Sequence, residues 1–327
     1  MEKLICAYLY DRSSEMTFDF KNMEMVDVVN YSFAKVTDDG LIDTSRLFHL
    51  DQVLALKNNH RRVTVSIGGW GCDGFSQAVS TKEKTKKFVD SIVKFTKEVG
   101  LDGIDIDWEY PNSGSAGIAF SPDDTPNFTY FLKLLRAGLD SIRPNLLLTV
   151  AVGAGLKCVK DIEISIIKDY IDYLNIMTYD LGHSEDGAYR HHTNLYKAAS
   201  DPQVSGDMAV KAYHEAGMPY EKIILGSATY GKCFTLDRND KPTGHYPYWR
   251  IESELVHDKN VKFIWDEEAH APLAILNEHH YVTYDDPRSE KEKCDYIKEH
   301  NMAGIMYWEY TSDKFGTLLR TMYENLK

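Results

Sequence analysis

The chain has 327 residues, enough for one or two domains with a large buried core. Hydrophobic residues make up 43% and charged residues 27%, the ordinary proportions of a soluble globular protein. The net charge of −13 argues against a polyanion such as nucleic acid as a partner. No apolar run approaches the roughly eighteen residues of a membrane span, so we expect no membrane anchor. We also expect a monomer.

The start of the chain, MEKLICAYLY, lacks the basic stretch, apolar run and cleavage site of an export signal. We expect a cytoplasmic protein if Met1 is the native start, and a secreted or cell-surface protein if a signal was trimmed. Five cysteines without a CxxC pair predict reduced, mostly buried thiols rather than a disulfide framework or a zinc site.

Eight short apolar runs recur along the chain, each followed by polar loops and helical periodicity. They span residues 4–10, 25–33, 63–69, 102–110, 147–153, 172–179, 223–230 and 303–310. This repetition indicates βα units around a parallel sheet. Eight runs favour a closed (β/α)8 TIM barrel over an open sheet, although periodicity alone leaves both possible.

Helices are predicted in the intervals, where polar residues precede apolar ones at helical spacing. Ser80 and Ser289, each with Glu three residues later, predict capping boxes at two helix starts. Thr125, followed by proline, is the predicted N-cap of a third helix.

The interval between the seventh and eighth runs, about 70 residues, is too long for a single loop. It contains the strand-like stretches KFIWD, APLAIL and HYVTYDD. We therefore predict a barrel formed by residues 1–231 and 287–327, with residues 232–286 as a compact α+β insertion. Loops 112–124 and 181–206 are candidate walls of the active-site cleft.

The fourth run carries three carboxylates at every second position. Alternate side chains of a strand share a face, so Asp105, Asp107 and Glu109 line one side and apolar residues the other. Like charges packed in a barrel interior repel, and at least one pKa should be raised. Glu109 stands last, at the mouth where barrel chemistry occurs, and is the predicted proton donor to a glycosidic oxygen.

Two other interpretations of this run are a structural ion pair and a metal site. No basic residue lies nearby in sequence to pair with the carboxylates, and Asp, Glu and Gly are poor strand formers, which favours a site over a structural ion pair. Three carboxylates also suit Mg²⁺ or Ca²⁺, but the aromatic neighbours favour a sugar. His183, His191 and His192 are interpreted as surface residues of a loop, so we expect no metal.

DGIDIDWEYP at residues 102–111 resembles the DxxDxDxE signature of glycoside hydrolase family 18, the family of chitinases. Further blocks resemble those of the family, and they occur in the family's order. They are NYSFAKV (30–36), SIGGW (66–70), NIMTYDL (175–181), ILGSATYGK (224–232), TYDDPRS (283–289) and GIMYWEY (304–310).

The resemblance implies a chitinase that hydrolyses β-1,4-linked N-acetylglucosamine with retention and without a cofactor. In this family the substrate's own 2-acetamido oxygen is the nucleophile, and the protein supplies one acid. Carried over, Glu109 protonates the leaving oxygen and then activates water. Asp107 orients the acetamido N–H and offsets the developing positive charge, and Asp105 shares a proton with Asp107.

The resemblance also implies substrate-binding residues. Tyr179, which shares a face with Met177, would hydrogen-bond the acetamido group, and Asp180 would contact the sugar at the reacting position. Trp308 would form the floor under this sugar, and Trp70 a platform on the leaving-group side. The remaining pocket residues would be Tyr8, Phe33 and Tyr110.

The sequence departs from the family pattern at two positions. Lys232 stands where many members have Arg, which keeps a donor but loses bidentate geometry. Leu273 stands where an aromatic residue is common in the insertion, and because the insertion is compact we do not expect a deep tunnel. Three alternatives stay open: a non-catalytic chitin-binding lectin, an endo-β-N-acetylglucosaminidase acting on N-glycans, and a peptidoglycan hydrolase.

Overall fold

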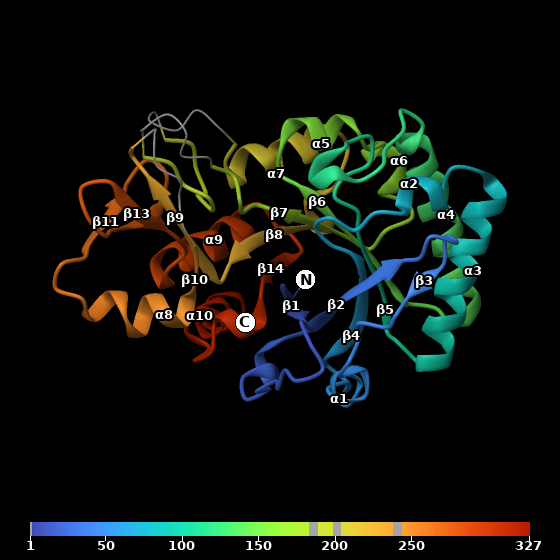
Figure 1. Cartoon of the computed structure of the whole chain (residues 1–327), viewed down its shortest axis with the longest axis horizontal. Coiled ribbons are helices and arrows are strands. Elements are labelled where there is room, and N and C mark those ends of the chain that lie inside the picture. Colours follow the sequence, from blue (N-terminus) through green and yellow to red (C-terminus); the bar gives the residue numbers. More distant parts are fainter. Residues whose placement is uncertain (1, 183–188, 199–203, 238–243) are drawn as a thin grey trace.

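The computed structural model describes residues 2–182, 189–198, 204–237 and 244–327. Within these ranges eight parallel strands close into a barrel, because β1 pairs with both β14 and β2 at the ends of the strand order. The barrel strands, in spatial order, are β1 (Leu4–Tyr10), β14 (Gly304–Trp308), β8 (Ile223–Ala228), β7 (Tyr173–Met177), β6 (Leu147–Gly153), β5 (Gly103–Asp107), β4 (Arg62–Gly68) and β2 (Val28–Val36). The predicted (β/α)8 TIM barrel is confirmed (Figure 1).

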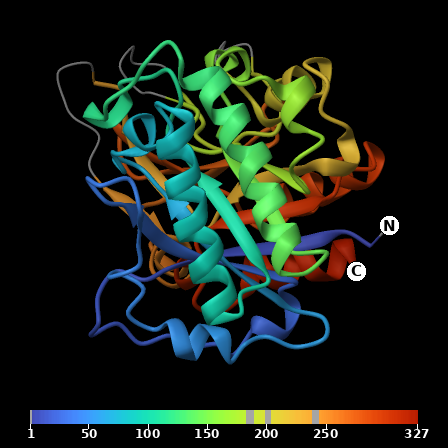
Figure 2. The same ribbon diagram turned by 90° about the vertical axis from the view of Figure 1, so that its right-hand side faces the viewer.

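Helices cover the outside of the barrel, and the short strand β3 (Ile42–Asp43) pairs antiparallel with the last residues of β2. Two long helices, α3 and α4, run side by side along the barrel in both views (Figures 1 and 2). The helices around the barrel are α1 (Leu50–Leu54), α2 (Phe75–Ala78), α3 (Lys82–Val99), α4 (Asp124–Ile142), α5 (Leu156–Lys160), α6 (Ile164–Ile167), α7 (Gly206–Glu215), α9 (Pro287–Glu299) and α10 (Thr317–Leu326).

The barrel strands separate apolar from polar side chains as the alternation predicts. Trp108, just beyond β5, points outward and stacks on Phe75 at 5.2 Å, with Phe128 edge-on at 5.5 Å. Asp105, on the other side of the same strand, lies in the buried barrel interior. Burial of the aromatic layer holds the helices on the sheet and leaves the polar side chains facing inward.

The predicted helix caps are wrong by one to three residues. Thr81, not Ser80, caps α3, and its hydroxyl accepts a backbone N–H at 3.2 Å. Asp286 caps α9, and Ser289 is the reciprocal partner inside the first turn. Thr125 lies within α4 rather than before it. Each helix start has several consecutive polar residues that could serve as the N-cap, and the packing of the helix on the barrel decides which of them does.

A five-stranded antiparallel sheet is inserted between β8 and β14, and it is the orange part of Figure 1. Its elements are β9 (Tyr230–Thr235), β10 (His245–Pro247), α8 (Tyr248–Ser253), η4 (Leu255–His257), β11 (Lys262–Asp266), β12 (Ala271–Ile275) and β13 (His280–Thr283). Only Thr229 separates β8 from β9, so the sheet grows directly out of a barrel strand. That residues 232–286 form a domain of their own stays a prediction.

The two ends of the chain lie together at the start of the barrel strands (Figures 1 and 2). Leu4 begins β1 in register with Gly304, the first residue of β14. The Lys327 ammonium donates to the Lys3 carbonyl oxygen at 2.8 Å. Both ends are therefore on the side of the barrel away from the carboxyl ends of its strands.

The five cysteines are free, and four of them are buried, as predicted. None of the helices in the described ranges combines the length and the apolar character that crossing a bilayer requires. Among the described residues, three peptide bonds that do not precede proline are cis, and they join Ser32 to Phe33, Glu109 to Tyr110 and Trp308 to Glu309.

Candidate active site

Asp105 is the deepest of the three carboxyl groups and is fully buried. It accepts hydrogen bonds from the hydroxyls of Tyr8 (3.0 Å), Ser66 (2.7 Å) and Thr149 (2.5 Å), and from the Asn175 amide at 3.2 Å. Burial raises the pKa of Asp105, although these four donors favour its ionised form. The surrounding strands therefore hold this side chain in one position.

Asp107 and Glu109 follow on the same side, toward the mouth. Burial raises the pKa of Asp107 well above its usual range, and the charges of Glu109 and Asp105 act in the same direction. Burial raises the pKa of Glu109 to about 7. The expectation that at least one of these pKa values is raised is confirmed. The Oδ1 atom of Asp107 is buried and has no hydrogen-bond partner within the described ranges.

The tripeptide Trp-Glu-Tyr occurs twice, at the ends of β5 and β14, but its two glutamates have different surroundings. Glu309 accepts a hydrogen bond from the Ser312 hydroxyl at 2.8 Å and lies 3.5 Å from the Arg12 guanidinium. Its carboxylate is therefore occupied in holding the turn η5 (Tyr310–Ser312). Glu109 is the one of the two that is placed to exchange a proton with a ligand.

Tyr179 lies just past the end of β7, two residues beyond Met177, so that both side chains face the mouth. Burial raises the pKa of Tyr179 well above its usual range, and the charges of Asp107 and Glu109 act in the same direction. The Tyr179 hydroxyl is consequently a neutral donor close to the carboxyl groups.

Asp180 follows at φ +58°, in the left-handed region, and turns its carboxylate toward β9. Its Oδ1 atom accepts a hydrogen bond from the Tyr230 hydroxyl at 2.5 Å and lies 2.7 Å from the Lys232 ammonium. Although burial opposes it, a hydrogen bond with His192 and the charge of Lys232 hold the pKa of Asp180 well below its usual range. Lys232 thus keeps the ion pair with Asp180, but as a single charged ammonium group without the bidentate geometry of an arginine.

His191 and His192 are buried, so the prediction that they are surface residues is wrong; His183 lies outside the described residues. The Nε2 atom of His192 lies 3.2 Å from the Tyr230 carbonyl oxygen, and the Asp180 N–H points to its Nδ1 atom at 3.4 Å. The same Nδ1 atom lies 3.6 Å from the Asp180 Oδ1 atom, so each ring nitrogen has an oxygen acceptor for a proton. Burial lowers the pKa of His192, in keeping with a neutral ring. The histidine is part of the frame that fixes Asp180.

Trp308 ends β14 and forms the floor of the cleft. Its ring is stacked on Phe33 at 5.4 Å with an interplanar angle of 18°. Tyr8 and Tyr10, which share one side of β1, pack against the same indole at 5.8 and 5.5 Å. Four aromatic side chains from three strands therefore pack into one apolar cluster below the mouth, with the Tyr8 and Tyr10 rings tilted by 53° and 36° to the indole.

Trp70 stands at the rim, where 63% of its surface is exposed. It lies edge-on to Tyr110 at 6.5 Å. The glycine before it is required, because a Cβ on Gly69 would come within 2.6 Å of the Phe33 ring and φ is +84°. A large exposed aromatic residue fixed by a glycine turn is available for stacking on a ligand.

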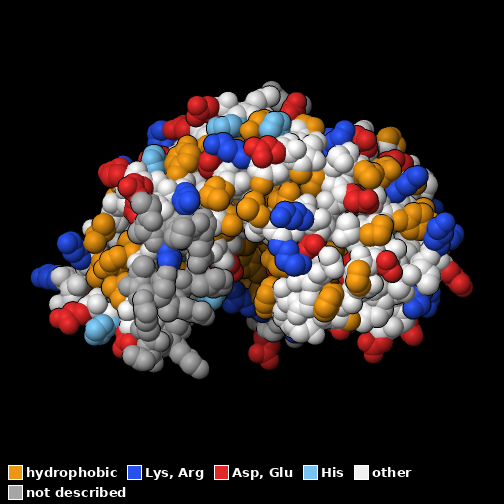
Figure 3. Space-filling view, turned by 90° about the horizontal axis from the view of Figure 1, so that it is seen from above, with side chains coloured by type: hydrophobic (Ala, Val, Ile, Leu, Met, Phe, Trp, Pro, Cys, Tyr) orange, Lys and Arg blue, Asp and Glu red, His pale blue; other side chains and the backbone are white. Residues whose placement is uncertain are grey.

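These groups line a cavity of about 730 Å³ at the mouth of the barrel. Seen from above, the surface is hollowed near its centre, with hydrophobic side chains around the hollow (Figure 3). Nine of the eleven predicted residues line it, namely Tyr8, Phe33, Trp70, Asp107, Glu109, Met177, Tyr179, Asp180 and Trp308. Asp105 lies beneath the cavity, and Tyr110 packs beside Trp70 outside its lining.

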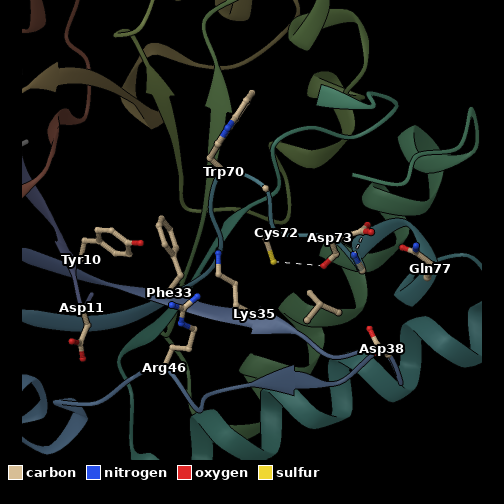
Figure 4. A pocket seen from close by; sticks show the side chains of 13 residues that line it. Tyr10, Asp11, Phe33, Lys35, Asp38, Arg46, Trp70, Cys72, Asp73 and Gln77 are labelled. Atoms are coloured by element: carbon tan, nitrogen blue, oxygen red, sulfur yellow. Dashed lines mark hydrogen bonds between the residues drawn. The ribbon is translucent and has the colours of Figure 1, made fainter. Parts of the chain in front are cut away.

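A second cavity, of about 510 Å³, adjoins the first on the side of β2 and β4 (Figure 4). The two share Tyr10, Phe33, Lys35 and Trp70, so the second is a side branch of the cleft. Its outer wall carries exposed charged residues, among them Asp38 and Arg46. Sequence reasoning did not predict this branch.

Several residues of the main cavity were also missed. They are Tyr10, Arg12, Lys35, Tyr230, His245, Pro247, Trp249, Glu309, Thr311 and Ser312. Tyr10 and Lys35 follow Tyr8 and Phe33 by two positions, so strand alternation contained the signal for both. No local signal existed for His245 or Trp249, because the inserted sheet brings them to the cleft.

Within the described residues, no group of three or more His, Cys, Asp and Glu side chains has an arrangement that suits a metal ion. The carboxyl groups of β5 are instead surrounded by hydroxyl and amide donors and by aromatic rings. Such a site favours an uncharged, hydroxyl-rich ligand with apolar ring faces.

A (β/α)8 barrel with carboxyl groups of raised pKa under an aromatic cleft is the architecture of barrel enzymes that act on sugars. A family model described as "Glycosyl hydrolases family 18" matches residues 4–313. The chain therefore belongs to glycosyl hydrolases family 18, and the resemblance drawn from the sequence motifs is confirmed.

Curated relatives carry chitinase names. Chitinase A1 of Niallia circulans is 28% identical over 335 residues, which cover 89% of this chain and 48% of that protein. Probable chitinase 2 of Drosophila melanogaster is 30% identical over 293 residues, covering 81% of this chain and 59% of the relative. The chain thus spans about half the length of these relatives.

Solved structures extend the similarity over the whole chain. A family 18 N-acetylglucosaminidase from Paenibacillus barengoltzii is 33% identical with a TM-score of 0.90, covering 99% of both chains. Chitinase ChiW of Paenibacillus sp. str. FPU-7 is 31% identical with a TM-score of 0.89, covering 99% of this chain and 42% of that one.

Proposed function

We propose that this chain hydrolyses β-1,4-linked N-acetylglucosamine polymers and oligomers with retention of configuration. The observation that carries the proposal is Glu109, a carboxyl group in the cleft whose pKa is about 7, next to Asp107. Relatives named chitinases and a similar N-acetylglucosaminidase support the same sugar.

Glu109 is the proposed general acid. With a pKa of about 7, roughly half of the Glu109 carboxyl groups hold a proton at neutral pH, so the group both donates and takes back a proton readily. In the first step it protonates the leaving oxygen, and the bond to the sugar breaks. In the second step the ionised Glu109 removes a proton from the attacking water.

Asp107 is proposed to hold the nucleophile, which the substrate brings as its 2-acetamido oxygen. The unpartnered Oδ1 atom of Asp107 is available to accept the acetamido N–H, which turns the carbonyl oxygen toward the anomeric carbon. Ionised Asp107 also stabilises the positive charge of the oxazolinium ring that forms. Asp105, held by four donors, is proposed to share a proton with Asp107 and to release it as Asp107 turns toward Glu109.

The remaining residues are proposed to bind the sugar. Tyr179 donates to the acetamido oxygen, and Asp180, held by Lys232, accepts from a hydroxyl of the reacting sugar. Trp308 lies under this sugar, and Trp70 stacks on the leaving-group side. The same pocket is lined by Tyr8, Phe33 and Met177, and Tyr110 lies at its edge.

Replacing Glu109 with Gln tests the proposal, because the amide keeps the shape of the carboxyl group but carries no transferable proton. We expect hydrolysis of chitotetraose to fall by roughly 10²–10⁴-fold while calorimetry still detects binding. Asp123→Asn, at an exposed carboxylate before α4, is the control for loss of one acid. Substantial hydrolysis by Glu109→Gln would sink the assignment, and a wild-type chain that binds without releasing product would be a lectin.

Release of single N-acetylglucosamine units from a chain end is a second candidate. It is favoured by the similarity to the N-acetylglucosaminidase of P. barengoltzii, which matches this chain over 99% of its length. A time course of products from chitohexaose separates the two modes. Accumulation of monosaccharide from the first time point supports end-directed release, and mixed shorter oligomers support internal cleavage.

The protein is further proposed to act as a monomer without a metal or cofactor. The proposed reaction consumes only water and a substrate that brings its own nucleophile. Light scattering at assay concentration tests the monomer, and activity in EDTA tests the need for a metal. Whether the cell exports the protein stays a prediction that fractionation of cells and medium decides.

A further inference from the structure

Lys35 is a cation inside the cleft that the proposed reaction does not yet use. It comes from β2, two residues after Phe33, and is half-buried. Figure 4 shows its side chain rising between Phe33 and Cys72. It lines both the main cavity and its side branch, so it stands where the two meet.

Two contacts fix the Lys35 ammonium group. It donates to the Gly68 carbonyl oxygen at 2.5 Å and lies 5.0 Å from the centre of the Phe33 ring. Gly68 is in register with Asp107, and a Cβ on Gly68 would come within 1.9 Å of the Asp107 carbonyl oxygen. The carbonyl group that anchors the cation therefore belongs to a strand packed directly against the backbone of Asp107.

The groups that surround Asp107 and Glu109 are almost all acidic or neutral. Those acting on them from the packed elements are Asp105 of β5, Tyr8 of β1, Lys35 of β2, Cys72 after β4, Tyr110 after β5, Cys158 of α5, and Tyr179 and Asp180 after β7. Lys232, the other nearby cation, is paired with Asp180 at 2.7 Å. Lys35 has no carboxylate within 4 Å in the part of the chain that the structure describes, so its charge is not neutralised by a partner.

We propose that Lys35 is a positioning residue of the reaction, a fixed cation that keeps the Asp107–Glu109 pair from taking up a second proton near neutral pH. This inference rests on the proposed function, in which Glu109 is protonated while Asp107 is ionised. If the Asp107–Glu109 pair holds two protons, Asp107 is not ionised. If the pair holds none, Glu109 has no proton to donate.

The physical reason is the balance between burial and a nearby opposite charge. Burial drives both carboxyl groups toward their neutral forms, and the charge of Lys35 opposes this at Asp107 and at Glu109. A cation held in place by Gly68 and Phe33 acts without the reorganisation that a mobile surface lysine would need. Its effect is on the proton count of the pair, not on contact with the sugar.

The test compares the pH dependence of kcat/KM in three variants. Lys35→Met removes the charge, and both limbs of the profile should move to higher pH by about one unit. Lys35→Arg keeps the charge and should keep the wild-type limbs. Arg46→Met removes an exposed cation of the side branch and should leave the limbs in place. If Lys35→Met does not fold, as judged by circular dichroism, Lys35→Gln replaces it.

Wild-type limbs in the folded Lys35→Met or Lys35→Gln variant overturn the proposal, as does an equal shift in Lys35→Arg. A purely structural role predicts lower kcat or stability with unmoved limbs. Carbon-13 NMR of the labelled carboxyl groups in the free protein measures the same titration without substrate. If the chain fails to hydrolyse any acetylated oligomer, the proposed function is refuted. The NMR titration still decides whether Lys35 affects the protonation of Asp107 and Glu109.

Discussion

Replacing Glu109 with Gln should stabilise the folded protein at high pH and not at low pH. Burial raises the pKa of Glu109 from its ordinary 4.5 to about 7, so the folded state prefers the protonated form. Each pKa unit corresponds to about 1.4 kcal/mol, and ionised Glu109 therefore costs the fold about 3 kcal/mol relative to protonated Glu109. The stability that the protonated Glu109 side chain contributes to the fold is fully present below pH 4.5, and it is lost as the pH rises to about 7.

Because glutamine does not ionise, the difference in unfolding free energy between Glu109→Gln and wild type should grow by about 3 kcal/mol from pH 4 to pH 8. Urea unfolding followed by tryptophan fluorescence measures it, since the chain has five tryptophans. Glu278→Gln, at an exposed residue, controls for the loss of one carboxylate. A difference that is constant across this range, or that shrinks with pH, would refute the burial of an ionisable acid at this position.

Three further predictions concern the substrate and its contacts. Asp107→Asn should lower kcat by about 10²–10³-fold, measured on chitotetraose, because it removes the charge that stabilises the oxazolinium ring. Trp70→Ala should raise KM roughly tenfold, equivalent to about 1.4 kcal/mol, yet change the unfolding free energy by no more than about 0.5 kcal/mol, since 63% of the side chain is exposed. Fully deacetylated chitosan should yield no new reducing ends, because it lacks the acetamido nucleophile, whereas acetylated chains of equal length are cut.

The carboxyl groups of the site were predictable because their arrangement is local. The two-residue period of a strand is enough to bring Asp105 and Asp107 to one side and to send Trp108 to the other. The same period reaches past the end of β5 to Glu109. Likewise it pairs Phe33 with Lys35, a step that sequence reasoning did not take.

What sequence reasoning missed depends on contacts between distant segments. His192 belongs to a polar loop, and only the neighbouring strands bury it against Tyr230. Trp249 reaches the cleft because β10 pairs with β9 and the inserted sheet starts beside β8. The predicted cap residues were wrong for a smaller reason. Adjacent polar residues such as Ser80 and Thr81 can each cap the same helix, and the two alternatives differ little in energy.

The position of the chain ends has a practical consequence. Leu4 starts β1 and Lys327 folds back onto Lys3, so a protein, tag or solid support attached at either end meets the barrel on the side opposite the cleft. A long polymer can then slide across the mouth without meeting the attachment. The closeness of the ends also means that a short linker joining them closes a small loop at little entropic cost, which suits circular permutation with a new opening in an exposed surface loop.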